Sequence, residues 1–295
     1  MTVSTEPMPS LSLPSPAKIN LFLHITGQRD NGYHDLQTIF QLLDFGDNLT
    51  FYPNESGKIH LNGNIDGVDE KNNLIVRAAK LLQSSTGCSK GCTIELDKKL
   101  PLGAGLGGGS SNAATSLVAL NALWECGLAT DVLAELGEKL GADVPVFIYG
   151  QSAFAEGIGE ILTPMELPKK WFLVVTPDCQ VSTGEIFSHP QLTRNSSPIK
   201  IRALSEGQYR NDCQKVVVSL YPAVEKALKW AENFATPLMT GTGASVFCSF
   251  DNQAEANRAL AELPEKWSGF VAGSVNNSSL HLKLSEFFTG AWPSG

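Results

Sequence analysis

The segment Pro101-Leu-Gly-Ala-Gly-Leu-Gly-Gly-Gly-Ser-Ser111 carries five glycines within seven positions. Glycine adopts positive φ at little steric cost, so it lets backbone N–H groups come close to an anion. Ser110 and Ser111 then lead into residues 111–124, whose apolar side chains recur at helical spacing. The first N–H groups of a helix are unpaired and lie at its positive end. This order of glycine loop and helix therefore predicts a phosphate-binding site.

The same loop fits a second pattern, because Gly103, Gly105 and Gly108 satisfy G-x-G-x-x-G. In dinucleotide-binding folds that pattern follows a buried apolar strand and usually opens the domain. Here the charged stretch Leu96-Asp-Lys-Lys-Leu-Pro101 precedes the loop, a third of the way along the chain. The loop is not the G-x-x-x-x-G-K-[ST] motif either, since no lysine follows the glycines. A flexible turn capped by serine is a further alternative, but it does not account for so many glycines.

The composition limits the classes of function. Of 295 residues, 42% are hydrophobic and 18% are charged, as is typical of a globular protein. The net charge of −8, without any run of Lys or Arg, argues against a nucleic-acid partner. No stretch of 18 apolar residues and no signal-like N-terminus is present, so we expect no membrane association. The six cysteines lack metal-ligand spacing, so we expect free thiols in the cytoplasm.

Residue patterns in the first half predict strands and helices in mixed order. Residues 17–25 alternate as in a strand, which places Lys18 and Asn20 on one polar-bearing face, and Asn31-Gly32 predicts a turn. Asp143 precedes Val144-Pro145, so we place it on a loop or at a helix edge. Further strands are predicted at 48–52, 58–61 and 93–96, and helices at 73–82, 111–124 and 131–140.

A proline-bearing polar segment, residues 162–170, indicates a boundary between two domains, 14–165 and 166–288. Beyond it we predict strands at 171–176 and 270–274, helices at 221–234 and 254–263, and a second glycine turn at 240–245. Strands and helices do not alternate strictly in either half. The fold class that this predicts is α+β.

Residues 101–113 resemble the ATP-binding loop of the GHMP kinase superfamily, which is named for galactose, homoserine, mevalonate and phosphomevalonate kinases. The resemblance extends from about residue 14 to about residue 284. It implies a two-domain GHMP kinase fold with the active site in the cleft between the domains, and ATP and Mg²⁺ as cofactors. Three further segments carry it: Pro16–His24 with Gly32–Leu36, Gly141–Pro145, and Thr240–Ser245.

The length of the loop, Gly-Leu-Gly-Gly-Gly-Ser-Ser-Asn, favours one branch of that superfamily. The resemblance implies phosphorylation of the 2-hydroxyl of a methylerythritol unit that carries cytidine diphosphate, on a route to isoprenoid precursors. The implied partner is thus a small molecule, and the implied assembly is a monomer or weak homodimer. Another kinase of the superfamily, of the homoserine or mevalonate type, and a non-catalytic nucleotide-binding module are the alternatives.

Lys18 and Asp143 are the catalytic pair that the resemblance implies. A hydroxyl is a poor nucleophile. A carboxylate activates it as a general base, by accepting its proton while the hydroxyl oxygen attacks phosphorus. Lys18 would orient that hydroxyl and favour negative charge on the transferring group. From the residues alone, Lys18 could be a solvated strand lysine and Asp143 could cap a helix.

The resemblance also implies binding residues. Tyr33 and Phe187 would sandwich the cytosine, His34 would hydrogen-bond its edge, and Asn20 and Thr183 would reach the remaining polar groups. The implied ATP site comprises Asn73, Lys98, Pro101, Leu102, Gly103, Ala104, Gly105, Leu106, Gly107, Gly108, Gly109, Ser110 and Ser111. The Mg²⁺ ligands stay unknown.

Overall fold

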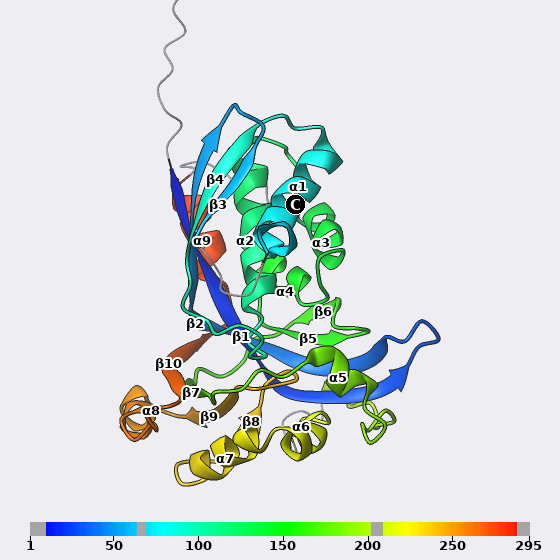
Figure 1. The fold of residues 1–295 in the computed structure, drawn as a ribbon, viewed down its shortest axis with the longest axis vertical. Helices are drawn as coiled ribbons and strands as arrows, with labels where there is room; N and C mark the ends of the chain where they lie inside the picture. Colours follow the sequence, from blue (N-terminus) through cyan, green and yellow to red (C-terminus); the bar gives the residue numbers. More distant parts are fainter. Residues whose placement is uncertain (1–9, 64–68, 202–208, 288–295) are drawn as a thin grey trace, which may run out of the picture.

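The computed structural model describes residues 10–63, 69–201 and 209–287 (Figure 1). Figure 1 shows an elongated molecule, with helices α1 to α4 in one lobe, α5 to α8 in the other, and a long hairpin that runs between them. The elements of the first lobe are β1 Leu11–Gln28, β2 His34–Asn54, β3 Ile59–Asn62, the 3₁₀ turn η1 Glu70–Asn72, α1 Leu74–Thr86, β4 Gly91–Asp97, α2 Gly108–Leu123, α3 Thr130–Glu138, α4 Val144–Tyr149, β5 Ala153–Glu156 and β6 Ile161–Pro164.

The second half of the chain supplies the rest. Its elements are β7 Trp171–Thr176, α5 Thr183–Ser188, α6 Gln214–Leu220, α7 Pro222–Ala231, β8 Leu238–Met239, β9 Val246–Phe250, α8 Gln253–Leu260, β10 Ser268–Val275 and α9 Ser279–Phe287. The predicted α+β class is confirmed, and each helix and strand predicted from the sequence overlaps one of these elements. The sequence patterns did not indicate η1, α4, β5, β6, α5, α6, β8, β9 and α9.

The hairpin of β1 and β2 begins with Leu11 opposite Phe51 and closes with Gln28 opposite His34. Its turn contains Gly32 at φ +87°, as the Asn-Gly pair predicts. Between Asn20 and Leu23 a bulge shifts the register by one residue, and such a slip moves side chains to the other face. The simple alternation predicted for residues 17–25 is therefore wrong beyond Asn20.

That bulge lets one hairpin serve two hydrophobic clusters. Before it, Ala17 and Ile19 pack with strands at the centre of the molecule. After it, Leu23 and Ile25 pack into the core of the second lobe with residues of β7, β9, α6 and α7. The hairpin therefore holds the lobes together and fixes the position of residues between the two clusters, including Lys18 and Asn20.

A single path of strands also joins the lobes, in the order β3-β4-β2-β10-β7-β9-β8. The joint is short, because β10 pairs with β2 only at Ser274–Leu43 and Val275–Leu42 before it continues alongside β7. Strands β1 and β5 pair with β2 outside this path.

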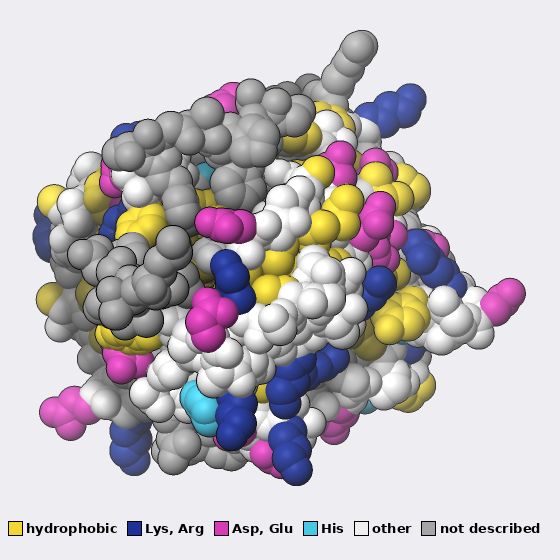
Figure 2. Space-filling view, turned by 90° about the horizontal axis from the view of Figure 1, so that it is seen from above, with side chains coloured by type: hydrophobic (Ala, Val, Ile, Leu, Met, Phe, Trp, Pro, Cys, Tyr) yellow, Lys and Arg dark blue, Asp and Glu magenta, His cyan; other side chains and the backbone are white. Residues whose placement is uncertain are grey.

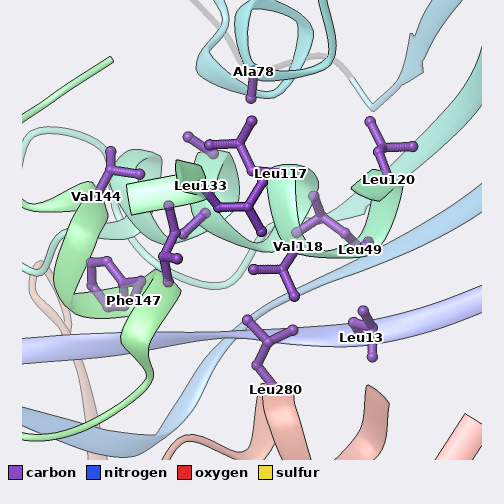
Figure 3. Close-up of a cluster of buried hydrophobic side chains, with 14 of the residues drawn as sticks. Leu13, Leu49, Ala78, Leu117, Val118, Leu120, Leu133, Val144, Phe147 and Leu280 are labelled. Carbon is purple, nitrogen blue, oxygen red and sulfur yellow. The ribbon is translucent and has the colours of Figure 1, made fainter. Parts of the chain in front are cut away.

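Helix α2 forms the centre of the first lobe (Figure 3). Its Leu117 and Val118 pack among side chains from α1, α3, α4 and the hairpin. Burial of one such side chain contributes about 1.5–3 kcal/mol, and α2 is buried on nearly every side. Leu280 of α9, from the end of the chain, packs against the same cluster. The predicted domain boundary at residue 165 stays a prediction. Helix α9, which it assigns to the second domain, packs with the first lobe.

The charged side chains are mixed on the face that Figure 2 presents, where Lys and Arg lie among Asp and Glu. Over the three described ranges, no helix is long and apolar enough to cross a lipid bilayer.

Candidate active site

Lys18 lies at the centre of the predicted site, with only 4% of its side chain exposed. Its ammonium group donates to Asn20 Oδ1 at 2.7 Å and to the carbonyl oxygen of Gly105 at 3.3 Å, and it lies 3.1 Å from Asp143 Oδ2. The same nitrogen lies 5.1 Å from the centre of the Phe40 ring. An ammonium group has three protons, so these contacts hold it in one place. The alternative of a solvated strand lysine is thus wrong.

Asp143 is the N-cap residue of α4, but its side chain makes no cap hydrogen bond. Pro145 stands in the first turn, where a missing N–H costs nothing, so the helix begins as the Val-Pro step predicts. One carboxylate oxygen faces Lys18, and a third of the side chain is exposed to solvent. The carboxylate is therefore fixed by a cation and accessible from outside, as a proton acceptor needs to be.

The glycine loop forms one side of the site. Gly103, Gly105 and Gly107 all have positive φ, between +61° and +76°. The loop is tied to β1, because the backbone N–H of Lys18 donates to the carbonyl of Leu106 at 3.0 Å. Gly107 is the N-cap of α2, with no side-chain cap. The first N–H groups of α2 can therefore donate to an anionic ligand, and phosphate binding at this helix start stays a prediction.

The dinucleotide-binding alternative does not fit this arrangement. Strand β4, which precedes the loop, pairs antiparallel with β2 over seven positions. Dinucleotide-binding folds are built from parallel strands with crossover helices on both faces of the sheet.

Ser110 and Ser111 have different surroundings. Ser111 is completely buried, and its hydroxyl oxygen lies 2.9 Å from that of Ser15. Asn112 Oδ1 can only accept, so Ser15 donates its one proton to it at 2.7 Å and holds the first turn of α2 against β1. Ser110 is half-buried and lies next to Gly141, two residues before Asp143. Ser110 is therefore the hydroxyl that faces the site.

The second glycine turn packs directly against the first. The hydroxyl of Thr240 donates to the Gly105 carbonyl at 3.2 Å and accepts from the Asn20 N–H at 2.9 Å. The Ser245 N–H donates to the Ala104 carbonyl at 3.2 Å. A Cβ on Gly105 would lie 2.3 Å from the Thr240 carbonyl oxygen, so only glycine fits there. The second glycine turn thus lies beside the glycine loop.

Lys98 and Leu74, which follows Asn73, lie beside Gly108 and Gly109 at the start of α2. Asn73 is buried as the N-cap of α1, where its Oδ1 accepts from the Ile75 N–H at 2.9 Å. Lys98 Nζ lies 2.6 Å from Asp47 Oδ2. The other oxygen of Asp47 accepts from the N–H groups of Lys99 and Leu100, both at 2.8 Å. Both predicted residues therefore also have local structural contacts.

His34 and Phe187 come together from different lobes, and their predicted roles in binding cytosine stay predictions. Their ring centroids lie 5.2 Å apart with the planes tilted by 34°. His34 is 7% exposed, whereas the side chain of Tyr33 beside it is largely exposed. Burial, and next the charge of Arg194, lower the pKa of His34, so the ring is neutral at neutral pH.

Asn20 and Thr183 contact the second glycine turn at different residues. Asn20 accepts from Lys18 and donates to Thr38 Oγ1 at 2.9 Å, and its backbone N–H donates to Thr240 Oγ1. Thr183 lies at the start of α5, where its hydroxyl is 2.9 Å from that of Thr242 in the second glycine turn. The role of Thr183 as a substrate contact stays a prediction, and so do the binding and catalytic roles of the other site residues.

Sequence reasoning missed three residues around this site. Asp47 joins Lys98 to the loop, Thr240 bridges the two glycine turns, and Arg194 donates to His34 Nε2 at 3.0 Å. Each of these three residues contacts partners that are far away in the sequence. Thr240 stands within the predicted glycine turn at 240–245, whereas no local sequence pattern points to Asp47 or Arg194.

Comparison with known families defines the class of protein. The family model for the N terminal domain of GHMP kinases matches residues 73–151, and the model for the C terminal domain of GHMP kinases matches residues 191–269. The first match contains the glycine loop and Asp143, and the second contains Arg194 and the second glycine turn. Fold and site are thus those of a GHMP kinase, a small-molecule phosphotransferase.

Two closely similar relatives belong to one family within the GHMP kinases. The 4-diphosphocytidyl-2-C-methyl-D-erythritol kinase of Pseudomonas syringae pv. syringae is 54% identical over 276 residues, which cover 94% of this chain and 98% of the relative. The kinase of the same name from Alkalilimnicola ehrlichii is 57% identical over 271 residues, or 92% and 93% of the two chains. The chain belongs to the family of 4-diphosphocytidyl-2-C-methyl-D-erythritol kinases.

Solved structures agree with this assignment. A crystal structure of 4-(cytidine 5'-diphospho)-2C-methyl-D-erythritol kinase superposes with a TM-score of 0.78 at 32% identity, covering 90% of this chain and 99% of that one. Homoserine kinase from Cytophaga hutchinsonii superposes with a TM-score of 0.61 at 17% identity, covering 94% and 98%. The second likeness concerns the fold alone.

Proposed function

We propose that the chain transfers the γ-phosphoryl group of ATP to the 2-hydroxyl of 4-diphosphocytidyl-2-C-methyl-D-erythritol, on a route to isoprenoid precursors. The observation that carries the proposal is the 3.1 Å contact between Lys18 and Asp143 beside the glycine loop. The names of relatives that are 54% and 57% identical support the choice of acceptor.

Asp143 accepts the proton of the acceptor hydroxyl in this proposal. The hydroxyl oxygen forms its bond to the γ-phosphorus while the bond from that phosphorus to the β-phosphate oxygen breaks. The proton passes to Asp143, and ADP is the leaving group. Lys18 holds the carboxylate at one oxygen, so the other oxygen is directed to the substrate, and its charge stabilises negative charge on the transferring group.

The glycine loop binds the ATP phosphates in this proposal. Its N–H groups and the start of α2 supply the donors, while Asn73 and Lys98 lie at the side where the adenosine would extend. Asn73 keeps its amide N–H₂ for a ligand, since its cap bond uses only the oxygen.

Mg²⁺ would neutralise phosphate charge during transfer. In the three described ranges, no three acidic, His or Cys side chains are grouped to hold a metal ion. Mg²⁺ usually binds through substrate phosphates and waters with only one or two protein oxygens, so such a group is not required. Ser110 fits this need better than Ser111, because the hydroxyl of Ser111 is buried against Ser15. Ser110 is the protein hydroxyl that would hold the ion, since the accessible oxygen of Asp143 is assigned to the substrate hydroxyl.

The cytidine end would bind between Tyr33 and Phe187 and be read by His34. Two facts support this: His34 already lies against Phe187, and Tyr33 is exposed at the hairpin turn with a face free to stack. Thr183 at the start of α5 would contact the polar groups nearby, and Asn20 would contact the acceptor end. We also propose a cytoplasmic enzyme, since all six cysteines are free thiols.

A coupled ADP-release assay tests the function. We expect turnover with 4-diphosphocytidyl-2-C-methyl-D-erythritol and none with homoserine or mevalonate, and CDP should compete with the acceptor. Turnover of homoserine or mevalonate instead would establish a different GHMP kinase. ATP binding without turnover of any acceptor would indicate a nucleotide-binding module.

A further inference from the structure

Arg194 joins the two sides of the predicted base pocket. It lies after α5, in a segment without regular secondary structure. Its Nε donates to His34 Nε2 at 3.0 Å, and its two terminal nitrogens donate to the carbonyls of Phe187, His189 and Leu192 at 2.9 to 3.2 Å. The planar guanidinium group therefore fixes the end of α5, which carries Phe187, relative to the histidine of the hairpin.

This contact determines which ring nitrogen of His34 carries the proton. Arg is always protonated and can only donate, so His34 Nε2 must be the acceptor. A neutral imidazole that accepts at Nε2 carries its proton on Nδ1, and the lowered pKa of His34 agrees with a neutral ring. Within the described residues, no protein group bonds to His34 Nδ1. Nδ1–H is thus a fixed donor that is left for a ligand.

A fixed donor discriminates between pyrimidine bases. The ring nitrogen N3 of cytosine is an acceptor, whereas N3 of uracil carries a hydrogen. An N–H donor pairs with N3 of cytosine. Facing N3–H of uracil, it would leave both N–H groups without an acceptor in a half-buried site, which is unfavourable. If His34 could change its tautomer, Nδ1 would become an acceptor and would pair with uracil instead.

We propose that Arg194 is a positioning residue that sets base specificity: it fixes His34 as an Nδ1–H donor and thereby makes the pocket select cytosine over uracil. This inference rests on the proposed cytidine-binding function. A residue that merely stabilises the segment after α5 would weaken both pyrimidines alike when removed. Loss of the tautomer lock weakens cytosine and relieves the clash with uracil, so the ratio of the two affinities changes.

Competition by CDP and by UDP against the phosphoryl acceptor measures that ratio. In Arg194→Met we expect the preference for CDP to fall about tenfold or more, with KM for the acceptor rising more than kcat falls. Arg194→Lys keeps a charge and a donor, so it should recover part of the preference. Arg258→Met is the matched control, because Arg258 is 76% exposed on α8, and it should leave the ratio unchanged.

A double-mutant cycle shows whether Arg194 acts through His34. In a His34→Phe background, Arg194→Met should not change the CDP to UDP ratio further. An equal loss of CDP and UDP binding in Arg194→Met, or the same change in ratio with and without His34, would overturn the inference.

Nitrogen-15 NMR of the wild-type protein tests the tautomer directly and needs neither turnover nor a variant that folds. The inference requires a His34 ring protonated at Nδ1, with Nε2 as acceptor, and a ring protonated at Nε2 overturns it. If the wild type turns over no cytidylylated acceptor while the NMR signature is as expected, the proposed function fails and the state of His34 stands.

Discussion

Lys18 Nζ lies 3.1 Å from Asp143 Oδ2, although one residue is in the long strand β1 and the other begins the short helix α4. Asn20 accepts from the same ammonium group, and the Gly105 carbonyl completes its contacts. The lysine is therefore a fixed cation that joins the carboxylate, the strand and the phosphate loop.

Asp143→Asn should lower kcat by about a hundredfold to ten-thousandfold, because the amide keeps the shape of the side chain and loses the proton acceptor. ATP affinity should change little. Single-turnover phosphoryl transfer and ATP titration separate the two effects. Asp131→Asn is the control, since Asp131 is exposed and serves only as acceptor for the Tyr149 hydroxyl. Wild-type turnover by Asp143→Asn would remove Asp143 from the mechanism.

Gly107→Ala should weaken ATP binding and destabilise the protein more than Gly103→Ala does. Both glycines have positive φ, which costs another residue about 1–2 kcal/mol. A Cβ on Gly107 would also lie 2.8 Å from Phe147 and 3.1 Å from Lys18, whereas a Cβ on Gly103 would meet no atom within 4 Å. Urea denaturation and ATP titration of both variants measure the difference. Equal effects would show that the contact with Phe147 has no role.

Asp47→Ala should destabilise the protein by about 3 kcal/mol and raise KM for ATP. It removes a buried carboxylate and leaves the Lys98 ammonium and two backbone N–H groups without their acceptor. The exposed pair of Asp97 and Lys99, 3.5 Å apart, offers the control, since Asp97→Ala should cost less than about 1 kcal/mol. Equal unfolding free energies for the two variants would contradict the structural role of Asp47.

How far the sequence predicts this site depends on the range of the interactions. The glycine loop and the helix edge at Asp143 follow from local chemistry, because each is decided within a few residues. The Lys18–Asp143 pair came from resemblance to a family, and spacing alone left both residues with structural alternatives. The contact between Arg194 and His34 has no local pattern, so no sequence rule could find it.

The fold shows the same limit. Helix and strand periodicity located most elements, but the bulge after Asn20 has no sequence signal and moves Leu23 and Ile25 into the core of the second lobe. The packing of α9 against the first lobe also depends on tertiary contacts, since its Leu280 joins the hydrophobic cluster around α2. Local propensity can place an element along the chain, whereas packing decides which core it joins.

His24 should make the protein less stable in acid. It is 3% exposed, neither ring nitrogen has a hydrogen-bond partner among the residues that the structure describes, and burial lowers its pKa from 6.5. Below pH about 6.5 the imidazole of His24 therefore binds a proton in the unfolded chain but not in the folded chain. The free energy of unfolding then falls as the pH decreases toward the pKa of His24 in the folded state. One such group contributes a slope of at most about 1.4 kcal/mol per pH unit. His34 and His281 have pKa values lowered in the same direction, so they add to this dependence of stability on pH.

Urea denaturation between pH 7.5 and about pH 5 should show a smaller change of unfolding free energy per pH unit in His24→Leu than in wild type, and an unchanged one in the exposed control His60→Asn. An equal slope in His24→Leu and wild type would mean that His24 is protonated in the folded state.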